Sequence, residues 1–229
     1  MVIPSKEATQ WSVSQVVSVG WMRQFLYLTW LYERIKYVPG DVVECGLGEG
    51  NTFSMLAYLI GREDGIEPRK LFGFDSFEGW PEPDKSDESP RNPKKGEWSV
   101  AEEMIRKKLV DAGINKAFPN LKVSVAKGFL GETLPRLPHF DIAFLHIDVD
   151  LYEGYRDALK YLWDMVVVGG IVAFDEYLEF PNKPEYSNGT IEKWPGCTKA
   201  VDEFLNTTGQ GRQCLNYHQE TKKYYLIKK

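Results

Sequence analysis

Short apolar runs alternate with longer amphipathic segments along this chain of 229 residues. The apolar runs predict strands at 41–45, 70–74, 121–125, 142–147 and 169–174. The segments between them predict helices at 51–60, 100–112, 131–134, 152–165 and 197–206. Two final strands, at 213–217 and 222–227, are separated by polar residues and predict a hairpin that closes the sheet edge. We therefore expect an α/β fold with a doubly wound, mostly parallel sheet and a C-terminal antiparallel hairpin.

The chain shows no internal repeat and no second domain, so we predict a single domain over residues 1–229. An apolar region at 16–38 is interrupted by four charged residues and predicts a buried amphipathic helix, not a membrane span. The N-terminal segment 1–38 is expected to be helical and to act as a lid. Two proline-containing stretches, 78–98 and 178–195, are too long for ordinary connections, and we predict mobile substrate loops there.

Composition narrows the possible partners. A formal net charge of −5 argues against a nucleic-acid or anionic-membrane surface. The three cysteines lie far apart without metal-finger spacing, which fits a reducing compartment. The beginning of the chain lacks the pattern of a signal peptide. We expect a cytoplasmic protein that binds neither nucleic acid nor membrane.

Carboxylates follow two of the predicted strands. Asp148 and Asp150 come after the run at 142–147, and Asp175 and Glu176 come after the run at 169–174. Side chains alternate along a strand, so Asp148 and Asp150 should point the same way. Four acids at one sheet edge are costly unless their charge is offset, and Mg²⁺ prefers such oxygen ligands. The pattern therefore indicates a metal-assisted enzyme, although Asp150 alone could also cap the next helix.

A turn rich in glycine follows the first strand. Its glycines, which bring backbone close to a ligand, are Gly46, Gly48 and Gly50. NAD, FAD and S-adenosylmethionine (SAM) folds all use such a turn, but the dinucleotide fingerprint requires glycine where this chain has Asn51. Glu44 and Glu49 bracket the turn and would repel a pyrophosphate, whereas they suit the amino group and sulfonium of SAM. The turn therefore favours SAM.

Asp75 ends the second predicted strand. An acid at this place accepts hydrogen bonds from both ribose hydroxyls in nucleotide folds. The alternative is a turn cap beside Ser76. His146 shares the face of Asp148, and we favour a core histidine satisfied by hydrogen bonds over a base. Tryptophans in or beside the long loops, Trp80, Trp98 and Trp194, could equally stack on a sugar or anchor the loops.

Several motifs together resemble a known family. They are Val-Val-Glu-Cys-Gly at 42–46, Phe-Asp-Ser-Phe-Glu-Gly-Trp-Pro at 74–81, Gly-Glu-Thr-Leu-Pro at 131–135, His-Ile-Asp-Val-Asp-Leu-Tyr-Glu at 146–153, Gly-Gly-Ile at 169–171, Asp-Glu-Tyr at 175–177, and the segment 195–204. From about residue 41 to 205 the chain resembles the macrocin O-methyltransferase family of metal-dependent sugar O-methyltransferases. This resemblance implies a class I SAM-dependent methyltransferase fold, Mg²⁺, and transfer of a methyl group to a sugar hydroxyl.

The resemblance also implies roles for single residues. Asp148, Asp175 and Glu176 would hold the metal, and Asp150 would be the general base. The SAM-binding positions would be Glu44, Gly46, Gly48, Gly50, Thr52, Asp75, Ser76, Phe77, Gly128 and Asp148. One departure concerns Glu176, because the family usually has aspartate there; glutamate has a longer arm and could bind through water. A homodimer is plausible.

The expected partner is a small-molecule hydroxyl acceptor, in particular a sugar of a natural product or polysaccharide precursor, with two neighbouring hydroxyls presented to the metal. Three other readings remain open. One is methylation of another small-molecule hydroxyl, as in a catechol. Another is a glycosyltransferase whose Asp-x-Asp binds a metal and a nucleotide sugar, which would leave the glycine turn unexplained. The last is a non-catalytic relative that serves as a partner subunit.

Overall fold

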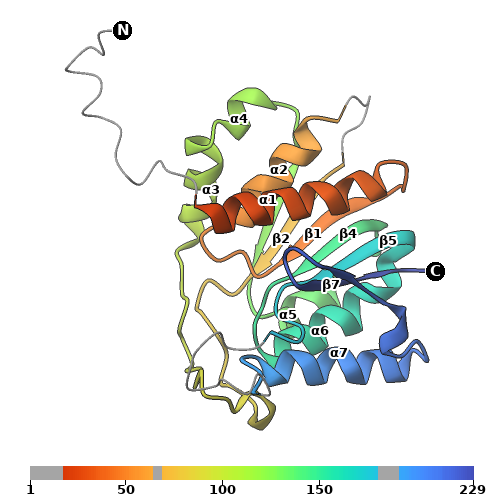
Figure 1. Cartoon of the computed structure of the whole chain (residues 1–229). Helices are drawn as coiled ribbons and strands as arrows, with labels where there is room; N and C mark the ends of the chain where they lie inside the picture. Colours follow the sequence, from red (N-terminus) through yellow and green to blue (C-terminus); the bar gives the residue numbers. More distant parts are fainter. Residues whose placement is uncertain (1–17, 64–68, 180–190) are drawn as a thin grey trace, which may run out of the picture.

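A single mixed sheet organises the protein, whose computed structural model describes residues 18–63, 69–179 and 191–229. The strands found there are β1 (Asp41–Cys45), β2 (Leu71–Asp75), β3 (Val123–Lys127), β4 (Ile142–Ile147), β5 (Val166–Phe174), β6 (Leu215–His218) and β7 (Lys223–Ile227). Their order is β3-β2-β1-β4-β5-β7-β6 (Figure 1). β1 to β5 run parallel, whereas β7 is antiparallel to β5 and β6. The predicted fold class is confirmed.

Helices cover both faces of this sheet (Figure 1). They are α1 (Val19–Tyr32), α2 (Asn51–Gly61), α3 (Glu102–Asp111), α4 (Ile114–Ala117), α5 (Leu130–Thr133), α6 (Tyr152–Leu162) and α7 (Pro195–Thr207). Apolar residues of α1 to α4 share one core on the first face. Those of α5, α6 and α7 share a second core on the other face. β4 is buried along its whole length because it lies between two strands and is covered by helices on both faces.

Two strands begin at other residues than predicted, and one short helix was not predicted. β3 begins two residues later than predicted, because its pairing with β2 sets its register and its own burial pattern is weak. β5 begins at Val166 and not at 169. Gly169 has a φ of 84° inside this strand, where the register with β4 shifts, so the glycine marks an irregularity and not the strand's start. The short helix α4 was not predicted; it follows Gly113, whose φ is 72°.

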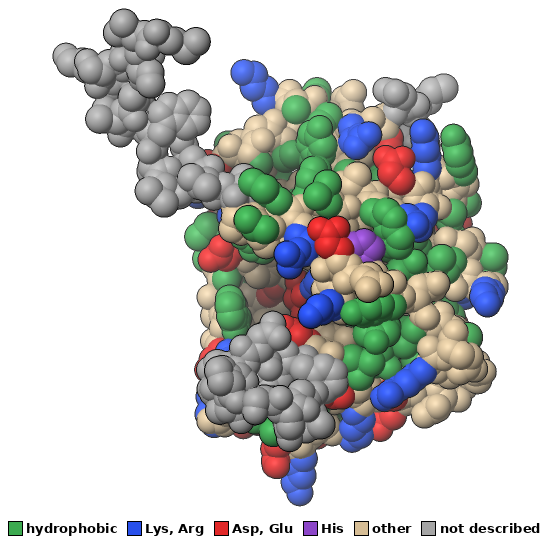
Figure 2. Space-filling view, viewed as in Figure 1, with side chains coloured by type: hydrophobic (Ala, Val, Ile, Leu, Met, Phe, Trp, Pro, Cys, Tyr) green, Lys and Arg blue, Asp and Glu red, His purple; other side chains and the backbone are tan. Residues whose placement is uncertain are grey.

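The predicted N-terminal helix is present as α1, and no helix among the described residues is long and apolar enough to cross a bilayer. α1 leaves several apolar side chains exposed, and they form part of the green surface on the upper half of the face in Figure 2. These are Val19, Trp21, Met22 and Leu26. These exposed side chains do not test the predicted homodimer, which stays a prediction.

The structure describes the whole of the first long loop but only part of the second. In the first, residues 78–98, Trp80 and Glu97 are joined by a backbone hydrogen bond of 3.0 Å, and Gly96 donates to the Trp80 carbonyl at 3.0 Å. Trp80 itself is buried against Trp194, with ring centroids 5.4 Å apart. Residues 180–190 of the second loop lie outside the described part. The predicted mobility of both loops therefore stays a prediction.

Candidate active site

The strand order reverses between β1 and β4, so the connections that follow them lead to helices on opposite faces of the sheet and leave room for a ligand. A cavity of about 730 Å³ opens there, within the usual size of small-molecule sites. Its wall includes most of the residues predicted for the site, namely Gly46, Gly48, Thr52, Asp75, Ser76, Gly128, Asp148, Asp150, Asp175 and Glu176. Residues that lie more than 100 positions apart in the chain thus face one space.

The glycine turn after β1 forms one wall of this cavity. Gly46 has a φ of 83°, and a Cβ atom there would lie 1.7 Å from the carbonyl oxygen of Asp148. Only glycine fits so close a backbone contact. Gly46 donates to Phe74 at 2.8 Å, and Asp148 donates to Cys45 at 2.9 Å. Backbone groups therefore bind the turn to both neighbouring strands.

Asp75, at the end of β2, holds the same turn from the other side. Its Oδ2 accepts hydrogen bonds from the backbone N–H groups of Leu47 at 2.7 Å and Gly48 at 3.3 Å. Its Oδ1 accepts from Phe77 N–H at 2.7 Å. The turn-cap alternative is thus realised in the structure. Because Asp75 also lines the cavity and a carboxylate has about four lone-pair sites, binding of a ribose stays a prediction that this geometry allows.

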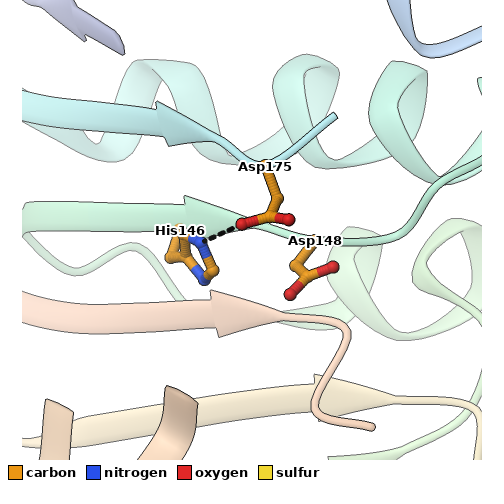
Figure 3. Close-up of side chains that lie close together, drawn as sticks. All are labelled: His146, Asp148 and Asp175. Carbon is orange, nitrogen blue, oxygen red and sulfur yellow. Dashed lines mark ion pairs between the residues drawn. The ribbon is translucent and has the colours of Figure 1, made fainter. Parts of the chain in front are cut away.

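The carboxylates after β4 and β5 meet at the floor of the cavity. His146, Asp148 and Asp175 each offer one ligand atom, and these three atoms lie within 4.8 Å of one another (Figure 3). Burial, and then the nearby charge of Asp175, raises the pKa of Asp148 to about 7. Burial acts on Asp175 in the same direction, but Lys223 and His146 outweigh it and hold the pKa of Asp175 well below its usual range. Buried carboxylates this close together are unfavourable unless positive charge lies beside them.

Glu176 lies deeper than the other acids, with 2 % of its surface exposed. Its Oε2 contacts the hydroxyl of Tyr155, which in turn accepts the backbone N–H groups of Asp175 and Glu176 at 3.2 and 3.3 Å. Burial, followed by the charge of Asp148, raises the pKa of Glu176 well above its usual range. Glu176 therefore borders the metal-ligand candidates without being part of the compact group of three.

Glu44, predicted to contact SAM, points elsewhere. Its side chain is buried and lies 3.0 Å from Nδ1 of His146, outside the cavity lining. His146 Nε2 faces Asp175 at 3.6 Å. Burial lowers the pKa of His146, but the neighbouring carboxylates of Asp175 and Glu44 outweigh it and raise this pKa to about 10. The prediction of a core histidine satisfied by hydrogen bonds holds for Nδ1 only, because Nε2 has no hydrogen-bond partner among the described residues. His146 lies between Glu44 and the carboxylate of Asp175.

Asp150 has a left-handed backbone, with a φ of 59°. A non-glycine residue in this region is uncommon, and strain of this kind often marks a functional site. The indole N–H of Trp80 donates to Asp150 Oδ2 at 3.0 Å. Burial raises the pKa of Asp150 to about 7, and the Trp80 hydrogen bond opposes that rise. Asp150 also lines the cavity.

Some residues of the site were not singled out by the sequence. Gln24 of α1 donates to Asp175 Oδ1 at 3.3 Å, and Lys223 of β7 forms an ion pair with the same oxygen. Neither belongs to a motif, and both come from elements far from residue 175 in the chain. Two predicted SAM-binding residues besides Glu44 are absent from the cavity wall: Gly50, the N-cap residue of α2, and Phe77, which packs in the core.

Comparisons with known proteins fit this geometry. The family model described as Macrocin-O-methyltransferase (TylF) matches residues 28–210. Demethyldecarbamoylnovobiocin O-methyltransferase of Streptomyces niveus is 29% identical over 174 residues, which cover 73% of this chain and 58% of that protein. The 8-demethyl-8-(2,3-dimethoxy-alpha-L-rhamnosyl)-tetracenomycin-C 4'-O-methyltransferase of Streptomyces olivaceus is 32% identical over 61% of this chain and 54% of its own length. The chain thus spans little more than half the length of these curated relatives.

Two solved structures of methyltransferases are similar to this protein. The crystal structure of CalS11, a calicheamicin methyltransferase, has a TM-score of 0.78 and 25% identity, and the match covers 98% of this chain and 86% of that one. The O-methyltransferase NovP has a TM-score of 0.71 and 25% identity, over 90% of this chain and 80% of that one. The fold is therefore that of the class I SAM-dependent methyltransferases. Within this class the chain belongs to the macrocin O-methyltransferase family, as the match over residues 28–210 shows.

Proposed function

We propose that this protein is a Mg²⁺-dependent O-methyltransferase that transfers the methyl group of SAM to a sugar hydroxyl of a natural product or its precursor. One observation carries the proposal. The glycine turn after β1 and the carboxylates Asp148, Asp150 and Asp175 line a single cavity. A donor-binding wall and a metal-binding floor in one space are what metal-assisted methyl transfer requires.

The residues present fit a divalent cation. Asp148 and Asp175 supply carboxylate oxygens from neighbouring strand ends, and a polar atom beside them, His146 Nε2, has no hydrogen-bond partner among the described residues. Mg²⁺ prefers oxygen ligands to imidazole. We therefore assign Asp148, Asp175 and Glu176 as the metal-holding side chains, and His146 as the group that orients Asp175.

The residues also fit SAM. Gly46 and Gly48 leave the turn without side chains on the cavity wall, and Asp75 and Ser76 stand beside them. Glu49 lines the same wall and suits an ammonium group. Because Glu44 lies behind this wall against His146, we infer that it acts on SAM through the turn and not by contact.

Asp150 takes the proton in this proposal. A sugar hydroxyl is a poor nucleophile at neutral pH, and a divalent cation, when bound, lowers the pKa of a coordinated hydroxyl and orients it. Asp150 Oδ1 accepts the proton as the oxygen attacks the methyl carbon, while Trp80 fixes Oδ2. Sulfur leaves as a neutral thioether, so no acid is needed. The chain's remaining task is to align the two reactants.

The relatives support a glycosylated acceptor. One of them methylates the 4′ position of a rhamnosyl tetracenomycin, and another is a mycinamicin III 3''-O-methyltransferase, 24% identical over 75% of this chain. The described structure adds Trp80 and Trp194, two buried indoles that line the cavity beside Asp150. Aromatic faces suit the apolar faces of a sugar ring. We propose an acceptor with two neighbouring hydroxyls, one of which is methylated.

Thermal melting of metal-free protein tests the assignment. S-adenosylhomocysteine (SAH), the demethylated product, should raise the melting temperature, since a ligand that binds only the folded state stabilises it. Mg²⁺ should do so separately. An acceptor panel of sugar diols, matched monohydroxy sugars and catechols then follows. No shift with SAH or SAM would contradict the proposal, and equal rates on diols and monohydroxy sugars would contradict the acceptor assignment.

A further inference from the structure

Lys223 lies inside the carboxylate cluster although it belongs to the C-terminal hairpin. β7 pairs with β5 in antiparallel register, with Ala173 opposite Tyr225. When this register is extended by two residues, from Ala173 to Asp175 and from Tyr225 to Lys223, Lys223 lies opposite Asp175. Its ammonium group forms an ion pair with Asp175 Oδ1 and donates to the Asp175 carbonyl at 3.2 Å. Only 19% of the Lys223 side chain is exposed.

The hairpin is held in place by an aromatic cluster with α1. His218, at the end of β6, packs against Tyr27 and Trp30 with ring centroids 4.9 and 4.8 Å apart. Trp30 also meets Tyr225 of β7 edge-on at 5.6 Å. α1 sends Gln24 to the same oxygen of Asp175. The hairpin that carries Lys223 is therefore packed against α1, so Lys223 differs from a lysine on a flexible surface loop.

The charge of the cluster gives this lysine a specific role. The carboxylates at the end of β4 and β5 are Asp148, Asp150, Asp175 and Glu176. Within the described residues, Lys223 is the only lysine or arginine that forms an ion pair with any of them. Several acids buried together are unfavourable without a counter-charge. In the protein without metal, Lys223 supplies that counter-charge at Asp175 together with His146, whose Nε2 lies 3.6 Å from the same oxygen.

We propose that Lys223 is the internal counter-ion of the metal-binding carboxylates, and that it sets how tightly the site binds Mg²⁺. This inference rests on the metal site proposed above. Lys223 and the metal neutralise the same carboxylates, and two cations beside one carboxylate repel each other. Lys223 therefore stabilises the metal-free protein and weakens metal binding. It acts on the reaction through Asp175, so it is a positioning residue and not a catalytic one.

The test compares Lys223→Met with wild type in metal-free form and across a Mg²⁺ titration, by thermal melting and calorimetry. The metal-free variant should melt about 4–8 °C lower, because a part-buried carboxylate loses its ion-pair partner. Its affinity for Mg²⁺ should rise about three- to tenfold. The Mg²⁺-induced rise in melting temperature should then exceed that of wild type by about 2–4 °C. A role in packing alone would lower both melting temperatures equally.

Two further variants complete the test. Lys223→Arg keeps the charge and should bind Mg²⁺ as wild type does, even if Lys223→Met folds poorly. Lys228→Met removes the same charge beyond the far end of β7, where Lys228 contacts Trp163, and should leave the Mg²⁺ affinity unchanged. Unchanged or weaker Mg²⁺ binding in Lys223→Met would overturn the inference alone. Absence of Mg²⁺ binding in wild type would overturn the proposed metal site with it.

Discussion

The two halves of the cavity are lined by different chemical groups. On the side of β1 and β2, the wall is mostly backbone: a turn with three glycines at positive φ, held by N–H groups that donate to Asp75. On the side of β4 and β5, the floor is mostly charge: Asp148, Asp175 and their neighbours, buried close together. The donor half depends on shape and the metal half depends on electrostatics.

This difference predicts different responses to substitution. A backbone wall tolerates no added atom at its closest contact. In a carboxylate floor, a substitution that keeps the shape of the side chain leaves the packing intact. Each lost charge, however, changes the affinity of the floor for a cation. The two halves meet where Gly46 touches the backbone of Asp148. The substitutions below use this contrast.

The largest effect is expected for Gly46→Ala. The new Cβ would overlap the Asp148 carbonyl oxygen, 1.7 Å away, so the turn must move away from β4. We expect a loss of about 4 kcal/mol or more in the free energy of unfolding, and loss of SAH binding. Urea unfolding and calorimetry measure both. The matched control is Gly48→Ala, which has no atom within 4 Å of its Cβ and should cost about 1 kcal/mol from its positive φ alone. Similar costs at both positions would show that the close contact is unimportant.

Asp150→Asn comes next. Asparagine tolerates the left-handed backbone and can still accept the Trp80 hydrogen bond, so the fold should be kept. We expect kcat to fall by about 10²- to 10⁴-fold because the base is lost. SAH binding, which belongs to the other half, should be unchanged. Activity close to wild type would reduce Asp150 to a cap at the start of α6.

Asp148→Asn should separate the halves most clearly. One metal-holding carboxylate is lost, and we expect Mg²⁺ affinity to fall by about 100-fold. The SAH-induced melting shift should remain. Since burial raises the pKa of Asp148, replacing it with a neutral group should not lower the melting temperature of the metal-free protein. If Mg²⁺ stabilises the variant as it does wild type, the metal lies elsewhere.

Trp80→Phe should give the smallest effect. Phenylalanine keeps an aromatic ring against Trp194 and removes the N–H that fixes Asp150 Oδ2. We predict that kcat falls about tenfold, as expected for loss of one orienting hydrogen bond of about 1.4 kcal/mol. KM for the acceptor should change little. A large rise in KM with kcat unchanged would show that the indole N–H of Trp80 serves acceptor binding and not the orientation of Asp150.

The sequence predicted some elements better than others, for a physical reason. β4 and α6 were placed correctly at their N-termini because an unbroken apolar run and an amphipathic segment are local patterns. β3 and β5 were misplaced because pairing with a neighbour decides where an edge strand or an irregular strand begins. Likewise, Asp148, Asp150 and Asp175 were recognised from strand ends, whereas Gln24 and Lys223 belong to no motif.

By itself, the sequence determined most strands and helices in their order along the chain, the glycine turn, and which strand ends carry acids. These features follow from patterns within about ten residues. Only the tertiary structure decided what each acid faces. It turned Glu44 toward His146, joined Trp80 to Asp150, and brought Lys223 to Asp175 through the antiparallel pairing of β7 with β5. Such contacts depend on how distant segments pack, and no local pattern contains that information.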